Sequence, residues 1–394
     1  MANVSSSNGI EKYPQLRFNG YSNPWTTQKL GNLGTFIKGA PLSKADISDE
    51  GNPFILYGEL YTTYSEVTHS VKRKTDKTVE QQFYSKIGDV IMPTSGETPE
   101  DIATASCIML PDVILAGDLL IYRTEQIDGR FVSYAIKNKV NKQISSVAQG
   151  KSVVHVRADE LAKICITFPA LDEQKKILNL LELLDTRIAT QQSLIETLKK
   201  YKRGVTDAIF CRKLCFADAE DSYPEWTCKK VGEVCKIQTG KSNTQDEIEN
   251  GAYNFYVRSP IVRKSNRYLF DCEAVLTVGD GVGTGKVFHY VNEKFDLHQR
   301  VYAMTNFTDI SGKYFYFYFS HFFYDRVMRM TAKTSVDSVR YEMIDQMNIL
   351  VPCEEEQKRI VGFLSSLDQI LERAETALTS METMKKGLLQ QLFI

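Results

Sequence analysis

The sequence lacks any long hydrophobic run. Nowhere in the 394 residues do apolar side chains approach the roughly 18 consecutive positions that a membrane-spanning helix needs. The opening residues, Met1 to Asn8, also carry neither the basic nor the apolar block of a signal peptide. The sequence therefore predicts a cytoplasmic protein that does not interact with a membrane.

Cysteine pairs spaced for metal binding are missing as well. The eight cysteines are scattered without CxxC spacing, which is typical of reduced thiols inside a cell. Cys211 and Cys215 lie four residues apart, but no neighbouring His or Cys pair completes a zinc site. We expect no bound metal.

Excess charge of either sign is absent too. The chain holds 48 Lys and Arg against 49 Asp and Glu, a formal net charge of −1. This balance gives no global attraction to nucleic acid, so a DNA-binding surface would have to come from the local placement of charges. The length predicts two or three domains at about 150 residues each.

Familiar catalytic signatures fail on inspection. The glycine-rich stretch from Gly279 to Lys286 departs from a P-loop, because Asp280 and Val287 occupy positions that need Gly and Ser or Thr. We interpret this stretch as a glycine hairpin after a strand at 274–278. The alternative is a backbone segment that approaches a phosphate, with Lys286 supplying the charge.

Other enzyme motifs are incomplete. Asn23-Pro24-Trp25 and Asn52-Pro53-Phe54 lack the second proline of the box that holds a base in amino-methyltransferases. The five histidines form no metal-ligand pair, and no Gly-x-Ser-x-Gly elbow occurs. The sequence therefore favours a binding protein over an enzyme.

An internal repeat is the most informative feature of the chain. The segment from Pro169 to Ile177 (PALDEQKKI) recurs 183 residues later, from Pro352 to Ile360 (PCEEEQKRI), and the match continues without a gap to the chain end. The copies also begin alike, with Trp25 matching Trp226 at an offset of 201. The second copy is thus shorter by 18 residues, and the middles do not align. This pattern suggests two modules that do one job on two different targets.

Each copy ends in a predicted long helix. Apolar residues recur at heptad spacing over more than four heptads, which favours a coiled coil over two unrelated amphipathic helices. Acidic residues in the first turn suit the positive end of a helix dipole. The main seam residues are Ile177, Leu181, Leu184, Ile188, Ile195 and Leu198 in the first copy, and Ile360, Leu364, Leu367, Leu371, Leu378 and Leu388 in the second.

The module interiors are predicted to be α/β (α+β), with strands dominant. Short β-branched and aromatic runs, such as those at 54–57, 152–156 and 253–257, alternate with turn residues. The segments 131–148 and 314–331 are predicted as helices, and the repeat favours helix for the ambiguous aromatic run 314–319.

Candidate DNA contacts come from basic clusters and from the repeat. Basic clusters are compatible with DNA contact or with a solvated face; they include Lys72, Arg73, Lys74, Arg258 and Arg263. By the 183-residue offset, Ser152, His155 and Arg157 match Ser335, Ser338 and Arg340 near each module's end. A DNA-facing role for these six is a hypothesis; the alternative is a strand that exposes polar side chains beside a helix start.

Three features occur in both copies: the duplicated Pro…Glu-Gln-Lys-Lys/Arg-Ile motif, the long helices that end in Gly-x5-Phe and the Trp-x4-Leu/Val-Gly module openings. In these features the chain resembles the specificity subunit of type I restriction–modification enzymes. The resemblance covers nearly the whole chain. It implies two target-recognition domains, at 1–168 and 213–351, each reading one half of a bipartite, asymmetric site on double-stranded DNA. It also implies two antiparallel spacer helices, at 169–212 and 352–394, related by a pseudo-twofold repeat.

The same resemblance implies partners. Two DNA methyltransferase subunits would bind the spacer helices and bring S-adenosylmethionine, and motor–nuclease subunits would join them and use ATP and Mg²⁺. This chain would bind none of these small molecules and catalyse nothing.

A helix over 172–209 would be about 57 Å long at 1.5 Å per residue, which is enough to hold two modules about one DNA turn apart. Rival interpretations are a stand-alone DNA-modifying enzyme and a coiled-coil scaffold that binds only protein.

Overall fold

The structure, a computed structural model, describes residues 12–150, 154–216, 225–281, 283–330 and 338–394. It divides into two compact units, which are described separately. Unit 1 comprises Met1–Gln191 with Ala377–Ile394, and unit 2 comprises Gln192–Thr376. Two long helices, α7 (Leu171–Phe210) and α11 (Glu354–Leu392), each contribute one half to each unit.

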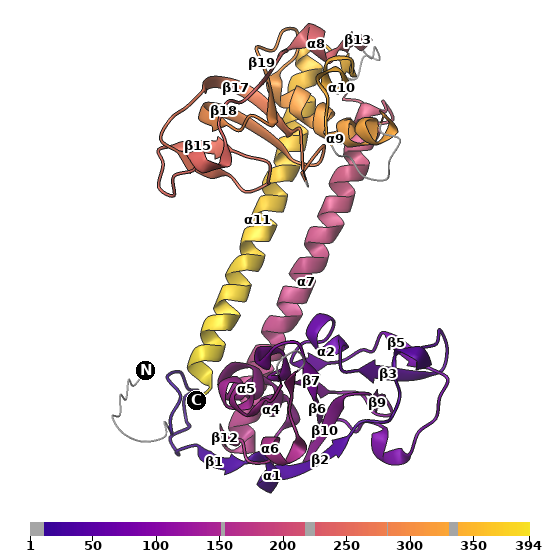
Figure 1. Cartoon of the computed structure of the whole chain (residues 1–394), viewed down its shortest axis with the longest axis vertical. Helices are drawn as coiled ribbons and strands as arrows, with labels where there is room; N and C mark the ends of the chain where they lie inside the picture. Colours follow the sequence, from indigo (N-terminus) through magenta and orange to yellow (C-terminus); the bar gives the residue numbers. More distant parts are fainter. Residues whose placement is uncertain (1–11, 151–153, 217–224, 282, 331–337) are drawn as a thin grey trace. The chain divides into compact units, whose positions relative to one another are not determined.

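Unit 1 contains many short strands (Figure 1). They are β1 (Thr26–Lys29), β2 (Gly34–Lys38), β3 (Asn52–Leu56), β4 (Val67–Thr68), β5 (Arg73–Thr75), β6 (Asp89–Pro93), β7 (Ser95–Gly96), β8 (Ser106–Ile108), β9 (Ile114–Ala116), β10 (Leu119–Thr124), β11 (Val154–His155) and β12 (Cys165–Phe168). Among the described residues, one sheet has the order β2-β10-β6-β8-β4 and another β5-β3-β9. Strand pairs β1-β12 and β11-β7 complete the unit.

Unit 1 also contains several short helices and helical turns. They are α1 (Leu30–Leu33), α2 (Glu59–Thr62), α3 (Pro99–Ile102), α4 (Gly129–Ala135), a π-helical turn (Ile136–Val140), α5 (Asn141–Val147) and α6 (Ala158–Leu161), with 3₁₀ turns at Lys44–Asp46 and Gln81–Phe83. Side chains alternate along β6, so Val90 and Met92 join the core that includes α4, while Ile91 joins a second core with β9. Both faces of the sheet are therefore buried.

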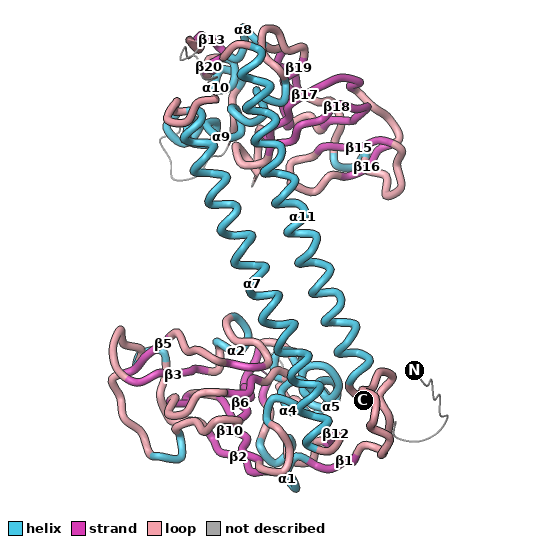
Figure 2. The backbone as a smooth tube through the Cα atoms, turned by 180° about the vertical axis from the view of Figure 1, so that it is seen from behind, coloured by secondary structure: helices cyan, strands magenta, loops and turns pink. Residues whose placement is uncertain are grey.

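Unit 2 repeats this plan with fewer strands (Figure 2). Its elements are β13 (Thr227–Lys230), α8 (Val231–Val234), β14 (Lys236–Thr239), a 3₁₀ turn (Thr244–Asp246), β15 (Tyr253–Tyr256), β16 (Arg263–Ser265), β17 (Phe270–Val278), β18 (Phe288–Leu297), β19 (Val301–Thr305), α9 (Gly312–Met330), α10 (Tyr341–Asp345) and β20 (Asn348–Val351). In its described residues one sheet has the order β14-β19-β17-β18-β15-β16, and β13 pairs with β20. The predicted mixed α/β class is confirmed, as is helix for the aromatic run 314–319.

The side chains of the predicted heptad seam are shielded from solvent along the whole seam. Each of its twelve main residues is buried or half-buried, in contrast to exposed neighbours such as Leu183 and Leu194. Within unit 1, Asp185 of α7 contacts Lys385 of α11, and within unit 2, Lys199 and Lys202 contact Glu375 and Asp368. In unit 2 the contact partner on α11 has a lower residue number when the residue on α7 has a higher one, so the two helices run antiparallel there.

The Glu-Gln part of the repeated motif has a structural explanation. Gln174 accepts a hydrogen bond from the Asp128 backbone and donates one to the Pro169 carbonyl. Gln357 makes the matching bonds, to the Ser311 backbone and the Pro352 carbonyl. Each glutamine is buried and ties the start of its long helix to the preceding strand and to the loop before α4 or α9. The motif therefore fixes the angle at which each helix leaves its module.

The dipole explanation for the acidic first turns was incomplete. Glu173 and Glu356 are buried, at 1% and 7% exposure, and make specific contacts. Arg17 forms a bidentate ion pair with Glu173, and the Trp226 indole donates to Glu356 at 2.9 Å. A buried carboxylate needs such partners because burial without them costs several kcal/mol, about 3 or more.

Candidate nucleic-acid interface

The candidate residues near the end of each module lie on a small backbone frame. In unit 1, β11 pairs with β7 so that His155 stands opposite Ser95. The Val156 N–H donates to the Thr94 carbonyl at 3.1 Å, and the Thr94 N–H donates to the Asp118 carbonyl at 2.8 Å. These bonds gather Ser95, Asp118 and His155 from three strand ends, and we call this set corner 1.

Unit 2 contains the same frame. The Val339 N–H donates to the Gly279 carbonyl at 2.8 Å, and the Gly279 N–H donates to the Arg300 carbonyl at 2.8 Å. Asp280 and Ser338 form an isolated antiparallel bridge, and the equivalent residues Ser95 and His155 pair antiparallel within the β7-β11 ladder. We call Asp280, Arg300 and Ser338 corner 2. The two corners thus share these two backbone hydrogen bonds and an antiparallel pairing, whereas the side chains differ.

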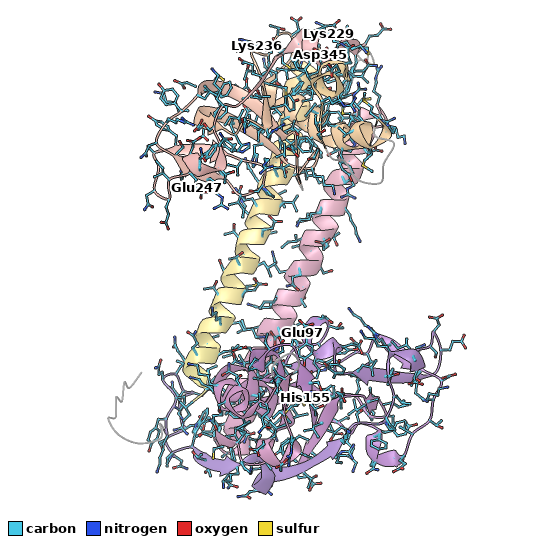
Figure 3. The ribbon with its side chains drawn as sticks, in the orientation of Figure 1. Glu97, His155, Lys229, Lys236, Glu247 and Asp345 are labelled. Atoms are coloured by element: carbon cyan, nitrogen blue, oxygen red, sulfur yellow. The ribbon has the colours of Figure 1, made fainter. Side chains whose placement is uncertain are left out.

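Corner 1 presents hydrogen-bond acceptors and a histidine. His155 Nδ1 lies 2.9 Å from Ser95 Oγ, and Ser95 Oγ lies 3.5 Å from an Asp118 carboxylate oxygen. The Tyr61 hydroxyl donates to the Ser95 carbonyl at 2.6 Å. Burial, reinforced by Asp101, raises the pKa of Tyr61, so the phenol remains a donor. Asp118 and His155 are exposed, and Figure 3 labels His155 among the side chains of unit 1.

Corner 2 presents cations. The Arg258 and Arg300 guanidinium groups each lie 4.0 Å from the same Asp280 oxygen. The Arg300 N–H donates to His298 Nδ1 at 3.1 Å. Burial and the two arginines lower the pKa of His298, so its ring stays neutral and can accept this bond at pH 7. The ammonium of Lys286 lies 5.2 Å from the Tyr324 ring centre, as in a cation–π contact.

The structure brings several predicted residues together here. The hairpin that carries Lys286 also contains Asp280 of corner 2. It passes close to Arg258, since a Cβ added at Gly283 would lie 3.0 Å from the Arg258 carbonyl oxygen. Ser338 pairs with the same hairpin at Asp280. The interpretation of 279–286 as a turn after a strand agrees with the observed β17, which ends at Val278.

Other predicted residues lie elsewhere or are already paired. Arg73, on β5, forms an ion pair with the buried carboxylate of Glu59 at 3.1 Å, and its neighbours Lys72 and Lys74 are exposed. Arg263, on the corresponding strand β16, contacts Glu247 at 2.9 Å. Ser152 and Ser335 lie outside the described residues.

Arg157 and Arg340 hold equivalent positions, each directly before a short helix. Arg157 forms a two-bonded pair with Asp159, at 2.9 and 3.0 Å, yet 75% of its side chain is exposed. Arg340 is exposed as well. Both guanidinium groups could therefore reach a phosphate backbone.

A hollow of about 980 Å³ adjoins corner 1. Asp118 lines it together with charged and aromatic side chains, among them Lys38, Lys44, Tyr57, Glu59 and Arg73. The hollow therefore connects corner 1 with the basic cluster on β5.

Within the described residues, no helix is both long and apolar enough to cross a bilayer.

Sequence reasoning missed Ser95, Asp118, Asp280 as a site residue, and Arg300. These positions fall within or beside the stretch where the repeat does not align, and each copy carries a different residue type. Asp118 and Arg300 directly precede the equivalent strands β10 and β19. Only the strand register reveals that they correspond, because no sequence motif marks them.

Two copies of one α/β fold, each with a corner of polar side chains, define a duplicated binding protein. A sequence profile for the type I restriction modification DNA specificity domain matches residues 22–200 and 223–379. The chain belongs to this family. The resemblance seen in the sequence is thus confirmed, and the chain is a non-catalytic DNA-specificity subunit with two DNA-recognition domains.

Individual relatives agree in length and fold. The chain is 24% identical over 399 residues to the type I restriction enzyme MjaVIII specificity subunit of Methanocaldococcus jannaschii, covering 93% of this chain and 92% of that protein. It is 21% identical to a putative type I specificity subunit of Mycoplasma genitalium, with 96% of each covered. The crystal structure of a type I restriction–modification S subunit from M. genitalium superposes with a TM-score of 0.67 at 19% identity, covering 97% of this chain and 99% of that one.

Proposed function

We propose that the two recognition domains each read one half of a bipartite, asymmetric DNA site, with corner 1 and corner 2 facing the two half-sites. The observation that carries this proposal is that the two corners share a backbone frame and differ in side chains. A shared frame would hold both domains against DNA in the same way. Different side chains would let each half-site have its own sequence.

The long helices would set the gap between the half-sites and dock two DNA methyltransferase subunits, which motor–nuclease subunits then join. The matched bonds of Gln174 and Gln357 support a defined geometry at each helix start. We propose functional divisions at 1–168, 169–212, 213–351 and 352–394. S-adenosylmethionine, ATP and Mg²⁺ would be held by the partner subunits and not by this chain, and the complex would work in the cytoplasm, where its DNA is.

Methylome sequencing tests the proposal. Cells that carry this chain with the methyltransferase subunits of its system should show methylation at one asymmetric motif interrupted by a fixed number of unspecified bases. Loss of this chain should abolish it. A motif that persists without the chain would contradict the proposal. Salt-dependent DNA binding by the chain with its methyltransferase subunits, compared with those subunits alone, separates DNA readout from a scaffold that binds only protein.

A further inference from the structure

The guanidinium of Arg300 lies near one carboxylate and is largely exposed. Its side chain is 62% exposed, and among the described residues its only acidic partner is Asp280, at 4.0 Å from Nε. Arg258 approaches the same carboxylate from the loop after β15 and is 48% exposed. Arginine carries five N–H donors, and within the described residues the Nη groups of Arg300 have no partner, so they can bind one beyond corner 2.

The backbone fixes where this guanidinium starts. The Arg300 carbonyl accepts from the Gly279 N–H, and the Arg300 N–H donates to neutral His298. The next residue, Val301, begins β19 and is paired with Val278 of β17. The backbone of Arg300 is therefore anchored on both sides by the sheet, and the Asp280 carboxylate, 4.0 Å from Nε, attracts its side chain. Such support is what precise recognition requires.

Among the four bases, guanine is the one that the guanidinium of an arginine matches best. Guanine presents two acceptors, O6 and N7, in the major groove, and an arginine matches both at once. Corner 1 has a carboxylate, Asp118, at the position equivalent to Arg300. A carboxylate accepts from the amino groups of cytosine or adenine and cannot bind the guanine acceptors.

We infer that Arg300, oriented by Asp280, reads a guanine in the half-site bound by unit 2. This inference rests on the proposed function and deepens it. It also means that the two half-sites differ at the base pair that faces Arg300 in one and Asp118 in the other. Asp280 is a positioning residue, because it acts through Arg300.

The test uses the chain in complex with its methyltransferase subunits and duplexes that carry the methylated motif. Each guanine is replaced in turn by 7-deazaguanine, which lacks N7 and keeps normal base pairing. At one guanine of one half-site, the replacement should weaken binding of the wild-type complex several-fold, because it removes one of the two acceptors of a bidentate contact that is worth about 5- to 150-fold in all. Arg300→Ala should bind both duplexes equally. Arg300→Lys should keep the charge and retain part of the discrimination, because lysine also contacts guanine O6 and N7.

Asp280→Asn separates orientation from folding. It should lower the ratio of specific to non-specific binding, while non-specific affinity rises because an acidic group near DNA is removed. A fall of both affinities together would indicate a structural role only. Lys236→Ala is the control, because Lys236 pairs with Thr305 at the other end of β19 from Arg300, and it should leave the discrimination unchanged.

The outcomes distinguish the two proposals. If the wild-type complex methylates no bipartite motif, the proposed function fails. If the motif is bipartite but Arg300→Ala remains as sensitive to 7-deazaguanine as wild type at every guanine, the guanine assignment alone is overturned.

Discussion

Lys385 on α11 lies 2.6 Å from Asp185 on α7, and Lys202 on α7 contacts Asp368 on α11 in the same way. Lys202 and Lys385 are 183 residues apart, and so are Asp185 and Asp368. The same pair is therefore made twice, with the helices exchanging roles. Such reciprocity is the pattern of an isologous contact, here between two halves of one chain.

The pair in unit 1 belongs to a larger, half-buried network. Lys385 also contacts Glu66, at 3.3 Å, and Glu66 contacts Lys137 at 3.2 Å. We expect Lys385→Met to destabilise unit 1 by about 1–3 kcal/mol, since it leaves two half-buried carboxylates, Glu66 and Asp185, with too little positive charge. Urea unfolding measures this. Lys199→Met is the control; it breaks an exposed pair with Glu375 and should have no measurable effect. Equal effects of both substitutions would contradict the account.

The same network predicts a pH dependence. Burial alone would raise the pKa of Glu66, but Lys137 and Lys385 overcome it and lower that pKa below 4.5. A carboxyl whose pKa is lowered by folding stabilises the fold above its unfolded pKa, and this stabilisation is lost as the pH falls through the folded value. The deficit of Glu66→Gln relative to wild type should thus be full at pH 7 and shrink below about pH 4.5. A deficit that stays constant down to pH 3 would refute it.

The two matched tryptophans should respond differently to substitution. The Trp226 indole donates to Glu356 at 2.9 Å, whereas the Trp25 indole N–H is buried and, within the described residues, has no acceptor. Trp226→Phe should therefore cost about 1.5–3 kcal/mol beyond the cost of Trp25→Phe, as expected for a hydrogen bond to a charged group. Thermal unfolding of the two variants makes the comparison. If Trp25→Phe is the more damaging, the assigned partners are wrong.

Arg157 and Arg340 are predicted to contact phosphates of different half-sites. Arg157→Ala and Arg340→Ala should each weaken DNA binding and flatten the slope of log affinity against log salt by about one unit. Neither should change the preferred sequence. Because Asp159 neutralises part of the Arg157 charge, we expect the smaller loss there. An unaltered slope in both variants would leave the two arginines with only a structural role.

The length of α7 should control the gap in the DNA site. Four helix-forming residues inserted after Gln191 add about one turn, or about 6 Å. Since base pairs are about 3.4 Å apart, the unspecified gap should grow by about one pair while both half-site sequences stay the same. Methylome sequencing measures the gap directly. An unchanged gap with full activity would mean that the helices do not set the spacing.

The sequence was sufficient for the repeated parts of the fold. Heptad spacing locates Ile177 to Leu198 and Ile360 to Leu388 on long helices, because apolar residues at this spacing form a continuous stripe only on a helix. The buried roles of Gln174 and Glu173 could not be predicted, since a polar residue in a first helical turn is usually exposed. Their partners, Asp128 and Arg17, lie 46 and 156 residues away in the chain.

The corners show where sequence reasoning fails. His155 and Ser338 were found because the repeat aligns there without a gap. Their neighbours Ser95 and Asp280 were missed because insertions and deletions change the offset in the intervening strands. Only backbone pairing restores the correspondence between Asp118 and Arg300. A function that depends on variation leaves little sequence pattern at the residues that carry it.

Exchange of one recognition module tests the central claim most directly. Residues 13–168 would be replaced by the equivalent module of another specificity subunit, and the methylome of cells expressing the hybrid with its methyltransferase subunits would be sequenced. We expect one half of the bipartite motif to change, with the other half and the gap length preserved. A hybrid that methylates a motif altered in both halves would contradict separate reading by the two domains.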